Sequence, residues 1–123
     1  MLKEIKLHTQ AKETAVDVTG EVQAAVAAGA LSEGFVFIYV PHAAAAVSIH
    51  RSLSREHAPK LDQMLAAVNP DREAPEFTKA AFVAPTEVGL VKDGRLLLGE
   101  DQRIYFYEFD GPRKRSVYVY VGG

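Results

Sequence analysis

The sequence predicts one α+β domain that combines short, largely antiparallel strands with two short helices. Short apolar runs recur along the chain and are separated by Gly, Pro, Asp and Asn, which favour turns. Two other segments repeat apolar residues at helical spacing. The length of 123 residues suits one domain, residues 1–123, and is too short for two ordinary ones.

The composition is that of a globular protein. Apolar residues make up 48% of the chain and charged residues 24%, and the net charge is −2. We therefore expect no nucleic-acid and no membrane partner. A cytoplasmic location is expected, because no apolar run reaches about 18 residues and no signal-peptide pattern is visible. The absence of Cys excludes disulfides, thiolate metal sites and cysteine nucleophiles.

The first part of the chain predicts two strands and a helix. Apolar and charged residues alternate imperfectly over residues 2–7, and residues 15–18 form a short apolar partner strand. Residues 21–28 place apolar side chains on one side of a helix. We expect Thr19 to cap this helix through its side chain and Gly29 to end it.

The middle of the chain is less regular. Residues 35–40 are apolar at every position, which predicts a strand buried on both faces. Residues 60–68 have the periodicity of a second helix, and polar residues 69–76 predict a loop. Periodicity leaves residues 77–84 open between a strand and a helical turn. An Asp-Gly pair in residues 92–94 predicts a hairpin. Further strands are expected at 47–49, 88–91, 96–98, 104–109 and 117–121.

Glu108 is a charged residue on an apolar strand face. Side chains alternate along a strand, so Glu108 shares a face with Ile104 and Phe106. A buried carboxylate must be ion-paired, hydrogen-bonded or protonated. Arg113 and Arg115 follow the next turn and are close enough to pair with it. One interpretation is therefore a Glu tied to an Arg that holds a hairpin, and the other is a carboxylate facing a substrate.

His42 follows the strand of residues 35–40 and directly precedes four alanines, residues 43–46. Small side chains leave backbone amides uncovered, so this segment could form the floor of a small ligand pocket. Close packing against another chain is the alternative. His8 has no neighbouring donor in the sequence and is expected to be a solvated strand residue.

The last two strands predict self-association. Residues 104–109 and 117–121 are apolar on both faces. The helices and the facing sheet can cover one face, but a chain of this size has little left to cover the other. We therefore expect the protein to form oligomers, since aromatic residues are enriched at interface cores.

The order of four segments resembles the YjbQ family. These segments are VDVT, GFVFIYVPHAAAAVSIH, KDGRLLLGEDQ and YFYEFDGPRKR. The resemblance extends over nearly the whole chain and is most specific around His42 and from Glu108 to Arg113. It implies a homotrimer with an α+β, sandwich-like sheet core. It also implies a thiamine-phosphate synthase activity, which joins a thiazole phosphate to an aminopyrimidine pyrophosphate at a site that gathers histidines.

The sequence departs from the family pattern at several of these positions. Ala43 and Ala44 stand where two threonines are usual, and Phe77 stands where a histidine is expected. A further family histidine is deleted with its loop, Asp101 replaces a Trp, and Tyr107 replaces a Cys. A catalytic Zn²⁺ needs about three ligands, so we expect no bound metal. The positions retained from the family are His42, Gln102, Glu108, Asp110 and Arg113.

Two functions follow from the resemblance. The first is a thiamine-phosphate synthase-type transferase acting on phosphorylated small molecules through a degenerate site. In it His42 acts as acid/base or as a phosphate contact, Arg113 holds the phosphate, and Glu108 orients one of these two residues. No cofactor would be bound tightly, although Mg²⁺ would accompany the substrate. The second is a non-catalytic homotrimer that binds a small phosphorylated metabolite. The remaining ligand-binding residues expected at the site are Gln102, Asp110, Ala43 and Ala44.

The segment from Glu73 to Phe77 discriminates between these two functions. Burial of Phe77 in the core would favour the non-catalytic protein. Placement of Glu73 or Glu76 toward His42 would supply a replacement acid and favour the transferase.

Overall fold

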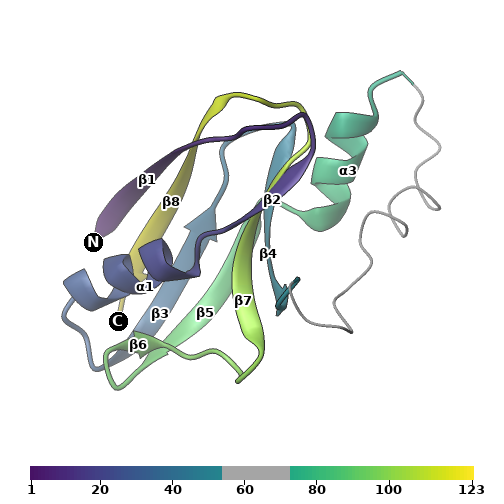
Figure 1. Cartoon of the computed structure of the whole chain (residues 1–123). Coiled ribbons are helices and arrows are strands. Elements are labelled where there is room, and N and C mark those ends of the chain that lie inside the picture. The colour runs from purple at the N-terminus through teal and green to yellow at the C-terminus, as the bar shows by residue number, and fades with distance from the viewer. Residues whose placement is uncertain (54–72) are drawn as a thin grey trace.

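The computed structural model of the protein describes residues 1–53 and 73–123 and confirms the α+β class (Figure 1). All the strand pairs are antiparallel. The strands are β1 (Leu2–His8), β2 (Thr14–Asp17), β3 (Glu33–Tyr39), β4 (Ala45–Arg51), β5 (Thr86–Lys92), β6 (Arg95–Leu96), β7 (Gln102–Glu108) and β8 (Lys114–Gly122). The helices are α1 (Thr19–Ala28) and α3 (Pro75–Val83).

Two sheets enclose the main core, as the sandwich-like prediction required. One has five strands in the order β1-β8-β3-β5-β6, and the other has three in the order β2-β7-β4. The inward side chains of β3, β7 and β8 meet between them, and α1 adds Val22 and Val26. On β7, Ile104 and Phe106 face this core, while Tyr105 and its alternate neighbours form a second cluster against Ala80 of α3. The alternation predicted for this strand is confirmed.

Helix α1 begins two residues before its predicted start. Thr19 is helical rather than the cap, and its N–H donates to the Asp17 carboxylate at 2.9 Å. The Thr19 hydroxyl instead accepts from the Ile104 N–H of β7 at 2.8 Å. The prediction of a Thr19 side-chain cap is therefore wrong, because that hydroxyl satisfies a buried strand donor instead. Gly29 ends the helix as expected.

Residues 77–84, which periodicity left open, lie mostly in α3. Pro75 is at the first helical position, where its missing N–H removes no hydrogen bond. The prediction of a loop over residues 69–76 is therefore wrong for residues 75 and 76, which are helical. The predicted helix 60–68 lies outside the described residues. Helix α3 packs on β4 and covers the outer side of the three-stranded sheet (Figure 1).

The outer side of the five-stranded sheet is apolar and uncovered. Val36 and Ile38 of β3 are fully buried, but Phe37 is 44% exposed. The prediction that β3 is buried on both faces is therefore wrong for this chain alone. The second face of β7 is covered instead, by α3. We call the exposed residues on this side the outer apolar face: Leu2, Phe35, Phe37, Tyr39, Val88, Leu90 and Tyr120.

The predicted Asp-Gly hairpin joins β5 to β6. Asp93 and Gly94 have φ values of 53° and 78°, the left-handed conformations that a tight hairpin turn requires. Strand β6 stops at Leu96, so the predicted strand 96–98 is too long. Within the described residues, we find no helix with the length and apolar character needed to cross a membrane.

Candidate functional site

Glu108 is fully buried at the end of β7, and its hydrogen-bond partners stabilise its charged form. Arg115 of β8 forms a two-pronged ion pair with it, donating from Nε to Oε1 at 2.8 Å and from NH2 to Oε2 at 2.6 Å. The Thr9 hydroxyl donates to Oε1 at 2.8 Å, and the Asp110 N–H donates to Oε2 at 3.0 Å. The interpretation of a Glu tied to an Arg is confirmed, with Arg115 as the partner.

This network controls the protonation of Glu108. Burial by itself would raise the pKa of the carboxyl, but Arg115 and the donors on Asp110 and Thr9 outweigh it and hold the pKa below its ordinary value. Glu108 is therefore ionised at neutral pH. The stability that it contributes is present above its unfolded pKa and is lost as the pH falls toward the folded pKa. Both of its oxygens are already engaged with these donors.

Arg113, the predicted phosphate ligand, forms a different pair. Its guanidinium contacts the Asp110 carboxylate at 3.0 Å and the Asp110 carbonyl at 2.8 Å. Both side chains are well exposed, so this pair stabilises the turn only weakly. The Arg113 N–H donates to the Thr9 hydroxyl, which links the turn to the end of β1. Asp110 and Arg113 therefore lie beside the Glu108 network but outside the cleft described below.

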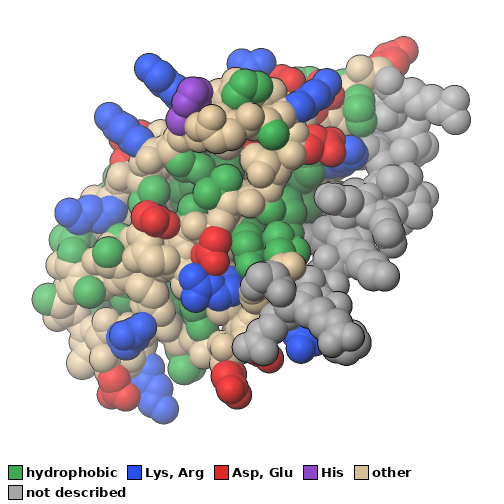
Figure 2. Space-filling view, viewed as in Figure 1, with side chains coloured by type: hydrophobic (Ala, Val, Ile, Leu, Met, Phe, Trp, Pro, Cys, Tyr) green, Lys and Arg blue, Asp and Glu red, His purple; other side chains and the backbone are tan. Residues whose placement is uncertain are grey.

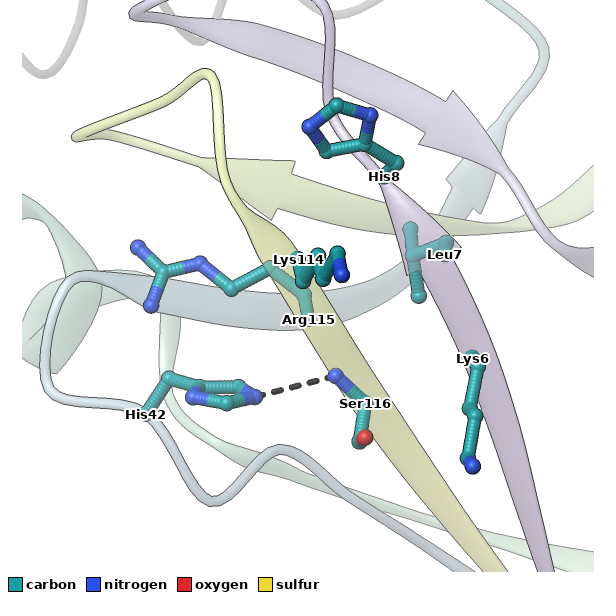
Figure 3. Close-up of a pocket in the computed structure, with 7 residues that line it drawn as sticks. All are labelled: Lys6, Leu7, His8, His42, Lys114, Arg115 and Ser116. Atoms are coloured by element: carbon teal, nitrogen blue, oxygen red, sulfur yellow. Dashed lines mark hydrogen bonds between the residues drawn. The ribbon is translucent and has the colours of Figure 1, made fainter.

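His42 completes the hydrogen bonding of β8 at the point where β3 ends. Its Nε2 accepts from the Ser116 N–H at 3.0 Å (Figure 3). The β3–β8 ladder ends where Tyr39 pairs with Tyr118. If the ladder continued for two more residues, Pro41 would lie opposite Ser116. The His42 ring takes the place of the missing strand partner there. Accepting this bond requires Nε2 to be unprotonated, so the neutral ring carries its proton on Nδ1.

The surroundings of His42 favour its neutral form. Burial lowers the pKa of the ring and the charge of Arg115 lowers it further, while Glu108 offsets only part of this effect. The structure therefore assigns His42 a structural hydrogen bond. Nδ1 remains the nitrogen through which His42 would contact a ligand.

An open cleft of about 510 Å³ lies beside His42 on the β1–β8 ladder. In the space-filling view, Lys and Arg side chains and a histidine surround the upper end of this ladder (Figure 2). The close-up shows Lys6 and His8 on β1 and Lys114 on the adjacent β8 (Figure 3). We call this region the cationic cleft, and its lining residues are Lys6, Leu7, His8, His42, Lys114, Arg115 and Ser116.

Three other predicted site residues lie elsewhere. Gln102 is at the opposite end of β7 from Glu108, about 20 Å away at roughly 3.3 Å per residue, and its Oε1 accepts from the Gly99 N–H. Ala43 is exposed in the turn after His42, and Ala44 is buried, with its carbonyl accepting from the Phe109 N–H. The structure brings neither Gln102 nor these alanines into the lining of the cationic cleft.

Lys6, His8 and Lys114 are the cleft residues that sequence reasoning missed. The sequence predicted His8 to be a solvated strand residue and assigned no site role to Lys6 or Lys114. They meet because Lys6 pairs with Ser116 and His8 pairs with Lys114 across the ladder. The available signal was the alternation of charged residues at positions 4, 6 and 8 together with the basic run 113–115. Only the register shows that these segments face each other.

The segment from Glu73 to Phe77 does not meet the burial condition, and its acids are not among the groups that shift the pKa of His42. Phe77 is 49% exposed and does not pack into the core. The charged groups that shift the pKa of His42 are Arg115 and Glu108, and α3 packs against β4 instead. Within residues 1–53 and 73–123, no three His, Cys, Asp or Glu side chains form a group that could hold a metal ion.

We expect protonation of His42 to destabilise the fold. Its folded pKa is below the ordinary value of 6.5, so the unfolded chain binds more protons as the pH falls below about 6.5. The free energy of unfolding should therefore decrease from pH 6.5 toward pH 5, by less than about 1.4 kcal/mol per pH unit for one proton. Urea titrations of the native protein and His42→Gln would check this. Gln keeps an acceptor for Ser116 but does not titrate, so an unchanged slope in the variant would contradict the assignment.

Comparison with known proteins identifies the family. The family described as UPF0047 protein YjbQ-like matches residues 3–123. The UPF0047 protein YugU of Bacillus subtilis is 33% identical over the whole of both chains. A UPF0047 protein of Methanocaldococcus jannaschii is 30% identical over all of this chain and 95% of that one. The crystal structure of an uncharacterised YjbQ/UPF0047 protein from Clostridium acetobutylicum superposes with a TM-score of 0.89, at 29% identity and with 98% and 99% of the two chains covered. These matches confirm the resemblance drawn from the sequence motifs, and the chain belongs to the UPF0047 family of YjbQ-like proteins.

Proposed function

We propose that this protein is a non-catalytic homotrimer that binds a small phosphorylated metabolite in the cationic cleft. The observation behind the binding site is the cleft itself, which Lys6, His8 and Lys114 line together with His42. Within the described part of the chain, Lys6 and Lys114 form no ion pair, so their charges are available to a ligand. Two fixed positive charges suit the double negative charge of a phosphate monoester.

The geometry gives less support to the transferase. That mechanism needs Glu108 to orient His42 or Arg113, but Arg115, Thr9 and Asp110 engage both carboxylate oxygens. Nε2 of His42 already accepts from a backbone N–H, which leaves Nδ1 for any proton transfer. Formation of thiamine phosphate from its two phosphorylated precursors, with Mg²⁺ present, would favour the transferase over the binding function.

The binding site is tested by removing its lysines. Isothermal titration calorimetry at low salt should show pyrophosphate and phosphate binding to the native protein. The double variant Lys6→Met/Lys114→Met should bind about tenfold more weakly or worse, because it removes both fixed charges, and tenfold corresponds to about 1.4 kcal/mol. The rise in Tm on adding ligand should likewise be larger for the native protein than for the double variant, since a ligand that binds only the folded state raises its stability.

The matched control is Lys3→Met/Lys92→Met. It makes the same change in net charge at two exposed lysines outside the cleft. Equal weakening in both variants would show that the anion responds to net charge alone, and the proposed site would be abandoned. His42→Ala should weaken binding as well if Nδ1 contacts the ligand.

Self-association is proposed through the outer apolar face. Seven large apolar side chains, each at least 36% exposed, lie together on one side of a single sheet. A patch of this kind on a small protein marks an interaction surface, and a second copy is the partner that the family resemblance implies. The homotrimer itself rests on that resemblance.

The assembly is tested at the centre of this face. Light scattering of the native protein should give three times the chain mass. Phe37→Ser/Leu90→Ser should shift the protein to monomer, because both side chains are exposed in the isolated fold and polar replacements remove apolar area from the interface. A native mass equal to one chain at all concentrations would rule out self-association.

A further inference from the structure

We propose that anion binding in the cationic cleft and self-association through the outer apolar face are positively coupled, so that the bound anion stabilises the assembly. This inference rests on the proposed function. Its basis is that Lys6, His8 and Lys114 of the cleft lie on the same side of the same sheet as the outer apolar face, which the strand registers show.

The cross-strand rows establish this arrangement. Leu2 pairs with Tyr120, which pairs with Phe37, which pairs with Val88. These four residues form an apolar row across β1, β8, β3 and β5. Side chains two residues apart on a strand share a face, so the neighbouring rows on this side can be read from the same registers. The next row contains Glu4, Tyr118, Tyr39 and Thr86.

The cationic residues form the following rows on the same side. Lys6 and Ser116 come one step beyond Glu4 and Tyr118, and His8 and Lys114 one step beyond that. Each step is about 6.6 Å along the strands. Lys6 therefore begins about 13 Å from the apolar row that contains Leu2, and its long side chain can shorten that distance. This is close to the Debye length of about 10 Å at 0.1 M salt.

The sign of the coupling follows from the charges. The acid on these rows is Glu4, whose carboxylate accepts from the Ser116 hydroxyl. Lys6 and Lys114 outnumber it. In a closed symmetric assembly every copy brings the same cations toward the edge of its interface, and covering that face with protein lowers the dielectric around them. Repulsion among these charges opposes assembly, and a bound anion removes it.

Linkage then acts in both directions. If the anion tightens the assembly by a given factor, assembly tightens anion binding by the same factor per site. The assembled protein should therefore be the high-affinity form for the phosphorylated ligand, and dilution should release it.

Sedimentation velocity across a dilution series tests this coupling. The concentration at half-assembly should fall about fivefold or more when 1 mM sodium pyrophosphate replaces sodium chloride of equal ionic strength. If the native assembly is too stable to dissociate on dilution, the same comparison in a Val88→Ala background brings dissociation into range, since Val88 is 60% exposed in the isolated fold.

The two double lysine variants test whether the response to pyrophosphate depends on the cationic cleft. Lys6→Met/Lys114→Met should assemble more tightly than the native protein without anion and should lose the response to pyrophosphate. Lys3→Met/Lys92→Met should keep the response. Pyrophosphate binding by calorimetry with no change in half-assembly concentration would overturn the coupling while the binding site stands. Absence of pyrophosphate binding, or a protein that stays monomeric, would overturn the coupling together with the corresponding part of the proposed function.

Discussion

Replacing Arg115 by methionine is expected to lower the free energy of unfolding by about 3–5 kcal/mol, because it leaves the buried charge of Glu108 without its counter-ion. Glu108 is 0% exposed and the Arg115 side chain is 9% exposed, so water cannot replace the guanidinium without rearrangement of the fold. Thr9 and the Asp110 N–H would remain as donors, but neither is charged. Urea denaturation of the native and variant proteins at pH 7 would measure this loss.

Two further variants test whether the uncompensated charge of Glu108 causes this loss of stability. Glu108→Gln/Arg115→Met removes the buried charge and keeps an acceptor oxygen, so it should be more stable than Arg115→Met alone. Arg113→Met breaks only the exposed pair with Asp110 and should lower stability by about 1 kcal/mol or less. If Glu108→Gln gives no relief in the Arg115→Met background, the loss comes from packing and the charge explanation fails.

Gly111→Ala should destabilise the fold strongly for so small a substitution. A Cβ at Gly111 would lie 2.3 Å from the Ala11 carbonyl oxygen and 2.6 Å from the Thr9 hydroxyl. The first contact is with backbone, so the two chain segments must move apart, which would also weaken the Thr9 bonds to Glu108 and Arg113. We expect a loss of about 1–3 kcal/mol or more, as for other overpacked sites. Thermal denaturation would show it as a lower Tm.

Gly20→Ala is the matched control for this substitution. A Cβ at Gly20 meets no atom within 4 Å, and Gly20 lies inside α1. Alanine in a helix is favoured over glycine by roughly 0.5–1 kcal/mol, so this variant should be as stable as the native protein or more stable. A comparable loss in both variants would contradict the steric explanation for Gly111.

The local features of this structure could be predicted from the sequence. Alternation along residues 104–109 assigned Ile104 and Phe106 to one face and Tyr105 to the other, and both assignments are confirmed. The Asp-Gly hairpin and the need of Glu108 for an arginine partner were also correct. These features depend on neighbours within a few residues, or on the rule that a buried charge must be compensated, so one sequence is enough to predict them.

The candidate site could be predicted only in part. His42 was singled out from the sequence and lines a cleft, but that cleft is not floored by residues 43–46, and the His42 Nε2 accepts from a backbone donor that lies 74 positions away in the chain. Gln102 and Glu108 belong to consecutive family segments in the sequence, yet the rise along β7 places them at opposite ends of the strand. The lysines of the cationic cleft had no local signal that separated them from other surface charges.

Composition, periodicity and motifs by themselves determined the α+β class, the family and the faces of the central strands. The tertiary structure alone decided that Arg115 rather than Arg113 pairs with Glu108, that Lys6 and Lys114 share a cleft, and that β3 exposes Phe37 while β7 is covered on both sides. The physical reason is that strand register joins residues more than 100 positions apart, such as His8 and Lys114. Such pairings are set by packing of the whole domain and leave no periodic trace in either segment.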